Sequence, residues 1–98
     1  MTDYIPEGFH SMTPHMTIKN CKGAIEFYKK TFDAEEKFKV LSPDGKKVIH
    51  GILQIGNSQF MMADEFPNQG AKSPDTIGGT PLTLQIYTDD ADKLYQQA

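Results

Sequence analysis

The chain has 98 residues, of which 38% are hydrophobic and 23% charged, so it holds one small core and not two independent domains. Its ten basic residues are all lysine, and thirteen acidic residues leave a formal net charge of −3. This argues against nucleic acid as a partner, because nucleic-acid-binding surfaces carry net positive charge and rely on arginine. No apolar run approaches the roughly 18 residues of a membrane span, and the first residues lack a signal peptide's basic start and apolar stretch. We therefore expect a cytoplasmic protein with no membrane partner.

The first elements in chain order are an extended arm, a strand and a helix. Residues 1–12 include a proline and a glycine and show no periodicity, which indicates an extended arm. Thr13–Lys19 is rich in β-branched residues and predicts a strand. Asn20 stands where a helix N-cap belongs, and apolar residues recur at three- and four-residue steps through Cys21–Phe32. This segment therefore predicts an amphipathic helix.

Three more strands are predicted after the helix. Glu36–Leu41 alternates apolar and charged residues, and a Ser-Pro-Asp-Gly turn follows it. Val48–Ile55 and Ser58–Asp64 are strands joined by a Gly-Asn dipeptide, which is the composition of a tight hairpin turn. Residues 13–64 therefore predict one complete βαβββ module.

The rest of the chain repeats the beginning of that module. Residues 65–80, rich in proline and glycine, predict a connector loop or a functional lid. Leu82–Tyr87 predicts a fifth strand, and a second helix follows in which the pattern Ala-x-x-(Phe/Leu)-Tyr recurs. We therefore expect a single α+β domain over 1–98, in which 81–98 begin a second module. On this interpretation the domain is incomplete.

The predicted hairpin sorts its side chains into two faces, because successive strand residues point in opposite directions. If Ile55 opposes Ser58, the apolar face that packs on the helix consists of Ile49, Leu53, Ile55, Phe60 and Met62. The opposite face mixes polar and apolar side chains: His50, Ile52, Gln54, Gln59, Met61 and Ala63. This mixed face is either a cavity wall or a half-solvated sheet surface, and a one-residue slip in the turn would exchange the two faces.

None of the three histidines shows the local spacing of a metal motif. His15 shares a strand face with Thr13, His10 lies in the arm, and His50 lies on the mixed face. Histidines with a carboxylate can hold a divalent metal, but a structural or solvent-facing role is the alternative for each. The single cysteine, Cys21, cannot form an internal disulfide and has no paired base, so we interpret it as an ordinary small residue. No catalytic residue is assigned.

Several segments, in the expected order, resemble the vicinal oxygen chelate superfamily, which includes glyoxalase I, bleomycin-resistance proteins and extradiol dioxygenases. Within it they are most similar to the PhnB-like, glyoxalase-type branch. The segments that carry the resemblance are Pro6–His10, Thr13–Ile18, Ala24–Lys29, Pro43–Lys46, His50–Gly56, Met62–Pro67, Ser73–Pro74 and Gly78–Pro81.

The resemblance implies a cup-shaped sheet built from paired βαβββ modules, with a small molecule in the cup, often on a divalent metal. By position, three metal ligands of catalytic members would fall on Thr13, Met61 and near Thr83, and the fourth in a strand outside these residues. Hydroxyls and a thioether bind a divalent cation poorly. We therefore expect the usual metal site to be absent and assign no cofactor.

The resemblance further implies a small-molecule-binding protein. The residues expected to line its cup are Thr13, His15, His50, Gln54, Gln59, Met61, Thr83 and Gln85. The two histidines would donate hydrogen bonds, act as a general base, or form an unconventional metal pair. Two alternatives remain open: a metal-dependent glyoxalase-like lyase, isomerase or dioxygenase, and a truncated assembly module without a ligand. Because one module leaves a sheet edge and its cup open, we also expect a homodimer.

Overall fold

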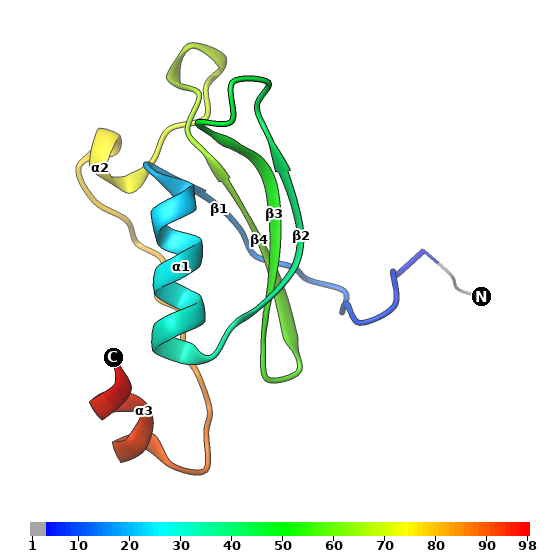
Figure 1. The fold of residues 1–98 in the computed structure, drawn as a ribbon, viewed down its shortest axis with the longest axis vertical. Coiled ribbons are helices and arrows are strands. Elements are labelled where there is room, and N and C mark those ends of the chain that lie inside the picture. Colours follow the sequence, from blue (N-terminus) through cyan, green and yellow to red (C-terminus); the bar gives the residue numbers. More distant parts are fainter. Residues whose placement is uncertain (1–3) are drawn as a thin grey trace.

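The computed structural model describes residues 4–98, and its centre is a four-stranded sheet with a helix packed on one face (Figure 1). The sheet order is β1-β4-β3-β2, with β1 parallel to β4 and the other neighbours antiparallel. The predicted βαβββ order is therefore confirmed. The elements are β1 (His15–Ile18), α1 (Cys21–Phe32), β2 (Glu35–Leu41), β3 (Val48–Ile55), β4 (Ser58–Asp64), the 3₁₀ turn η1 (Pro67–Gln69), α2 (Pro74–Ile77) and α3 (Ala91–Gln97).

Helix α1 begins and ends as its sequence predicts. The side chain of Asn20 accepts a hydrogen bond from the backbone N–H of Gly23 at 3.3 Å, which satisfies one free donor of the first turn. Asn20 itself is left-handed, with φ of 62°, a conformation that asparagine tolerates better than most residues. Lys29 and Lys30 lie in the last turn, at the negative end of the helix dipole.

The hairpin of β3 and β4 has the predicted register. Leu53 pairs with Phe60 and Gln54 with Gln59, and the pairing closes at Ile55 and Ser58. Gly56 in the turn has φ of 58°, which a residue without a Cβ adopts at little cost. This register places Leu53, Phe60 and Met62 beneath α1. Because successive strand residues point in opposite directions, the mixed polar and apolar side chains of the hairpin lie on the opposite face.

One expected core position is wrong. The buried apolar residues are Cys21, Ile25, Ala34, Val48, Leu53, Phe60 and Met62. Ile49, which was expected to pack on the helix, is 46% exposed. The pairing of β2 with β3 is irregular here, because Val40 pairs with His50 but Leu41 pairs with Val48. That irregularity breaks the strict alternation and puts Val48 in the core instead.

The predicted fifth strand does not form in the described chain. Residues 82–87 join no sheet, and Leu82, Leu84 and Ile86 are exposed. A strand is stabilised by the hydrogen bonds of a neighbouring strand, and within residues 4–98 the sheet consists of β1, β4, β3 and β2 alone. The segment instead runs past α1 as extended chain (Figure 1). The segment has the composition of a strand, but no described residue pairs with it.

Helix α3 forms where a second helix was predicted. The carboxylate of Asp90 caps it by accepting a hydrogen bond from the N–H of Lys93 at 2.9 Å. Its far end lies against the end of α1, where Gln97 Nε2 donates to Lys30 O at 3.2 Å and to Asp33 Oδ1 at 2.9 Å. No helix in residues 4–98 combines the length and apolar character needed to span a bilayer.

The connector between β4 and residue 80 contains short ordered turns. Glu65 accepts hydrogen bonds from the backbone N–H of Ser73 at 2.8 Å and from the hydroxyl of Thr76 at 2.7 Å. These bonds hold the pKa of Glu65 below its usual value, with the Thr76 hydroxyl as the largest cause. Ser73 is buried and caps α2. The connector is therefore folded onto the end of the sheet.

Candidate functional site

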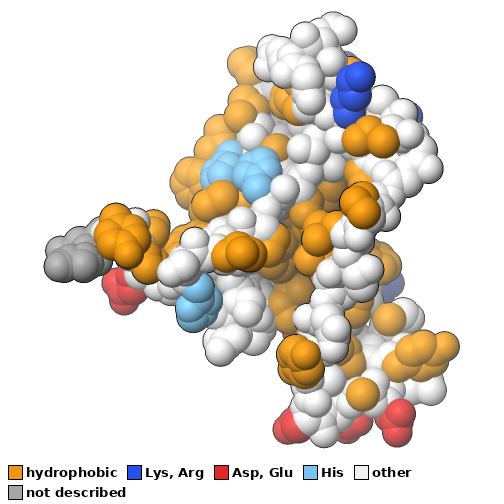
Figure 2. Space-filling view, turned by 180° about the vertical axis from the view of Figure 1, so that it is seen from behind, with side chains coloured by type: hydrophobic (Ala, Val, Ile, Leu, Met, Phe, Trp, Pro, Cys, Tyr) orange, Lys and Arg blue, Asp and Glu red, His pale blue; other side chains and the backbone are white. Residues whose placement is uncertain are grey.

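The sheet face opposite α1 carries one continuous row of side chains across all its strands. Cα pairing aligns His15 on β1 with Met61 on β4, Met61 with Ile52 on β3, and Ile52 with Phe38 on β2. Paired residues point to the same side of a sheet, so these four share one face. Figure 2, which views this face, shows two adjacent histidine side chains surrounded by hydrophobic ones.

The two adjacent histidines are His15 and His50. Their ring centroids lie 6.0 Å apart with an angle of 29° between the ring planes. On its other side the ring of His50 meets the edge of Phe38, also at 6.0 Å. The imidazoles therefore reach toward one another over β4, where Ala63 carries only a methyl group. In residues 4–98, neither ring forms a hydrogen bond or ion pair with an acidic side chain.

Two predicted glutamines lie on the same face, nearer the hairpin end, and both are engaged. Gln54 Nε2 donates to Gly56 O at 2.9 Å, within the hairpin. Gln59 Nε2 donates to Gly8 O at 3.1 Å and ties the N-terminal arm to the sheet. Gly8 has φ of 86°, a left-handed conformation that a residue without a Cβ adopts at little cost.

The structure divides the predicted ligand-binding set. It brings His15, His50 and Met61 together, with the two glutamines on the same sheet face and Thr13 just before β1. Thr83 and Gln85 lie elsewhere, in the extended segment beside α1, because that segment does not join the sheet. A cup that includes all eight residues is therefore not formed within residues 4–98.

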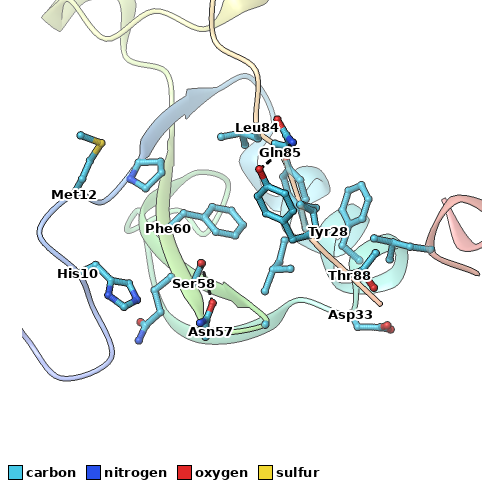
Figure 3. Close-up of a pocket in the computed structure, with 18 of the residues that line it drawn as sticks. His10, Met12, Tyr28, Asp33, Asn57, Ser58, Phe60, Leu84, Gln85 and Thr88 are labelled. Carbon is cyan, nitrogen blue, oxygen red and sulfur yellow. Dashed lines mark hydrogen bonds between the residues drawn. The ribbon is translucent and has the colours of Figure 1, made fainter. Parts of the chain in front are cut away.

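A cleft of about 760 Å³ lies between α1, the hairpin turn and residues 84–88 (Figure 3). Tyr28 and Phe60 form its aromatic wall, with ring centroids 5.7 Å apart in an edge-to-face arrangement. Polar groups at its rim include Asn57, Ser58 and Gln85, and the Gln85 amide donates to the hydroxyl of Tyr87 at 3.2 Å. Of the predicted residues, Gln59 and Gln85 line this cleft.

The sequence analysis did not identify this cleft, because it interpreted the apolar residues of Cys21–Phe32 only as a sign of an amphipathic helix. Phe27 is 55% exposed, and Tyr28 and Phe32 are only partly buried. The helix carries more aromatic rings than it buries, because none of the three is fully buried. That excess is the signal that could have indicated a binding surface at this end of α1.

A second cleft of about 740 Å³ separates β1 from the chain at residues 79–84. It is bordered by β1, by Phe27 and Tyr28 of α1, and by α2. Within residues 4–98, this opening lies between β1 and the segment that was predicted to form the fifth strand. His15 also lines this cleft, so β1 borders both the second cleft and the sheet face opposite α1.

Cys21 is not a reactive group. Burial raises the pKa of its thiol to about 12, and the negative charge of Asp64 adds to the effect. A thiol with that pKa is protonated at neutral pH and is a poor nucleophile and metal ligand. This agrees with the interpretation of Cys21 as an ordinary small residue, and the structure places it in the core.

Comparison with curated sequences gives relatives without an assigned activity, and no family model matches the chain. The chain is 40% identical over 91 residues to the uncharacterized protein Mb0911c of Mycobacterium bovis and to the uncharacterized protein Rv0887c of Mycobacterium tuberculosis. The matches cover 90% of this chain but 59% and 53% of these relatives. The chain thus spans little more than half of their length.

Solved structures show the fold. A gene product from Arabidopsis thaliana matches with a TM-score of 0.70 at 22% identity. The match covers 91% of this chain and 70% of the Arabidopsis chain. The fosfomycin resistance protein FosX from Listeria monocytogenes matches with a TM-score of 0.55 at 11% identity, covering 91% and 68%. The chain therefore has the glyoxalase/bleomycin-resistance fold, as predicted. These likenesses support the fold of the vicinal oxygen chelate superfamily and do not single out a branch.

One FosX structure is a complex with Mn(II) and sulfate, which raises the question of whether this chain fits such a metal. The positions that match the superfamily's ligands hold Thr13, Met61 and Thr83, and Thr83 lies outside the sheet. Mn(II) prefers carboxylate and imidazole donors to a thioether. Within residues 4–98, no three His, Cys, Asp or Glu side chains are grouped to hold an ion. The donor set at these positions does not fit Mn(II).

Proposed function

We propose that this chain is a small-molecule-binding protein of the vicinal oxygen chelate superfamily, of the PhnB-like type. The ligand occupies the cleft between α1 and the hairpin of β3 and β4. The observation that carries the proposal is the aromatic wall of Tyr28 and Phe60 in a cleft of about 760 Å³. Ligand sites are typically about 300–1,000 Å³, mostly apolar, with a few polar groups that fix orientation.

The chemistry of the lining defines the class of ligand. Three aromatic side chains of α1 and Phe60 offer ring faces and edges, which favour a planar or aromatic ligand. The polar groups are neutral amides and hydroxyls, apart from Asp33 and His10 at the margins. A partly apolar, planar molecule with hydrogen-bonding substituents therefore fits better than a highly charged one.

A fluorescence titration with anilinonaphthalene sulfonate, an aromatic anion with a planar naphthalene ring, tests the proposal. We expect saturable binding that raises the melting temperature, because a ligand of the native state stabilises it. Tyr28→Leu removes one aromatic face and should weaken binding roughly three- to tenfold. Gln85→Glu places a negative charge at the rim and should weaken binding in low salt, with recovery as the salt concentration rises.

Tyr95→Leu is the matched control, because Tyr95 is exposed on α3 and does not line the cleft. It should bind the probe like the native chain. Equal binding by all three variants would contradict the assignment of this cleft. Absence of saturable binding would favour the alternative of an assembly module without a ligand.

The metal-dependent enzyme is the second candidate, favoured by the FosX complex with Mn(II). If it held, incubation with Mn(II) and fosfomycin would consume fosfomycin, which phosphorus NMR detects. We expect no consumption, because Thr13, Met61 and Thr83 supply neither carboxylate nor imidazole. Turnover that is lost in Thr13→Val would support the enzyme and overturn the metal-independent proposal.

A further inference from the structure

We propose that the cleft between α1 and the hairpin of β3 and β4 prefers an aromatic ligand with a single positive charge, carried by a substituted ammonium group. The preference depends on the function proposed for this cleft and specifies the charge of its ligand. Three features of the lining within residues 4–98 support it: a cluster of aromatic rings, one carboxylate beside the cluster, and the absence of lysine.

The aromatic cluster lies on the last turns of α1. The ring of Phe32 meets that of Phe27 edge-on, with centroids 6.1 Å apart and planes 85° apart, and its centroid is 5.9 Å from that of Tyr28. Tyr28 meets Phe60 of β4, and both rings line the cleft (Figure 3). A ring face attracts a cation within about 6 Å of its centroid, because the ring quadrupole is negative on that face. Rings in different planes offer such faces from more than one direction.

Asp33 places a carboxylate at the end of this cluster. It follows α1 directly, with φ of 56°, and lines the cleft together with Phe32. One of its oxygens accepts the hydrogen bond from Gln97 Nε2 at 2.9 Å, and among residues 4–98 Asp33 forms no ion pair. The helix dipole of α1 is negative at this same end. The charge of Asp33 is therefore not neutralised by a neighbouring side chain and is available to a bound cation.

The remaining charged groups near the cleft do not oppose a cation. In the part of the chain that the structure describes, no lysine lines the cleft. Lys29, in the last turn of α1, is paired with Glu26 at 3.4 Å and with Glu36 at 3.6 Å. His10 lines the opposite side of the cleft, where Figure 3 shows it well apart from Asp33. The end of the cleft formed by α1 is therefore negative.

This combination favours an organic cation over a metal ion. Hard metal ions such as Mg(II) and Ca(II) need several oxygen ligands, and one carboxylate does not supply them. A substituted ammonium group is larger and more weakly hydrated, so contact with aromatic faces stabilises it at a smaller cost of desolvation. The amide and hydroxyl groups of Asn57, Ser58 and Gln85 suit neutral polar substituents elsewhere on the ligand.

Isothermal titration calorimetry with two probes of the same shape and different charge tests the preference. The probes are 3-hydroxyphenyltrimethylammonium, a cation, and 3-tert-butylphenol, its neutral counterpart. In low salt we expect the native chain to bind the cation at least about fivefold more tightly. Asp33→Asn removes the charge, keeps an oxygen for the bond from Gln97, and tolerates the left-handed conformation. It should weaken binding of the cation about threefold and leave binding of the neutral probe unchanged.

Three further measurements sharpen the test. Phe32→Leu keeps an apolar side chain but removes a ring, so it should weaken binding of the cation more than binding of the neutral probe. Asp33→Asn should strengthen binding of anilinonaphthalene sulfonate, because that probe is an anion. Asp75→Asn is the matched control, since Asp75 is also exposed but lines the second cleft, and it should bind both phenol probes like the native chain. Circular dichroism checks that each variant is folded.

Equal affinity of the native chain for the two phenol probes would overturn the preference for a cation and leave the assignment of the cleft in place. So would an equal loss of cation binding in Asp33→Asn and Asp75→Asn. Failure of the native chain to bind any of the three probes would overturn the proposed function, and the preference with it.

Discussion

The carboxylate of Asp64 accepts a hydrogen bond from the backbone N–H of Cys21 at 3.1 Å, and through its second oxygen it accepts one from Val48 at 2.7 Å. Both bonds are buried. One side chain thus joins the end of β4 to the first turn of α1 and to the start of β3. Because both N–H groups are buried, water does not take the place of the carboxylate as their acceptor when the side chain is changed.

Asp64→Asn should lower the free energy of unfolding by about 1–3 kcal/mol, because an amide offers one acceptor oxygen and turns a donor toward the other N–H. Urea denaturation measures the change. Asp89→Asn is the control: Asp89 is exposed, and a surface change of this kind stays within about 0.5 kcal/mol. Equal stability of the two variants would show that Asp64 does not join these elements.

Cys21 makes stability depend on pH in the alkaline range. Its pKa is about 12 in the folded chain against an ordinary value of 9.0, so the unfolded chain releases this proton first. The unfolded state then binds fewer protons, and stability falls as the pH rises above 9. Between pH 8 and pH 10 the native chain should lose about 1.4 kcal/mol that Cys21→Ala does not lose. Urea denaturation at both pH values measures the free energy of unfolding of each chain. An equal loss in the two chains between pH 8 and pH 10 would contradict this assignment.

A pair of methionines tests where the core lies. Met62 is fully buried beneath α1, and Met12 in the arm is 86% exposed. Met62→Ala should cost about 2–5 kcal/mol, since it removes apolar contacts and leaves a cavity. Met12→Ala should cost no more than about 0.5 kcal/mol. Thermal unfolding of the two variants measures both, and similar losses would mean that the arm is packed in solution.

We expect the chain to self-associate. Leu82, Leu84 and Ile86 are exposed along an extended segment, and among residues 4–98 no strand lies beside the outer edge of β1 or of β2. Light scattering should give twice the mass of the 11.0 kDa chain at micromolar concentration. Leu84→Lys should shift the population toward monomer, because a charge in an apolar interface is costly. A monomer for the native chain at this concentration would contradict the expectation.

The parts of the fold that the sequence predicts are those governed by local chemistry. Asn20 and the spacing of apolar residues define α1, and a two-residue turn at Gly56 leaves one register for the hairpin. That register also predicts that His50 and Met61 share a face. The predictions for these elements are confirmed because each depends on neighbours in the chain.

The parts that the sequence does not predict depend on distant partners. The irregular pairing beside Val40 places Val48 in the core instead of Ile49. It depends on how two strands pair, so no local sequence pattern predicts it. Leu82–Tyr87 has the composition of a strand, but pairing requires an edge at the right distance. For the same reason Thr83 and Gln85 lie apart from His15, and the aromatic cleft appears only when α1 and the hairpin are placed together.

The central claim is that a small molecule binds between α1 and the hairpin, and an NMR titration of the ¹⁵N-labelled chain with anilinonaphthalene sulfonate tests it most directly. The account predicts saturable shifts centred on the amides of residues 27, 28, 32, 33, 55–60 and 84–88, which line the cleft. Shifts centred on His15 and His50 instead, or no saturable shifts at all, would contradict it.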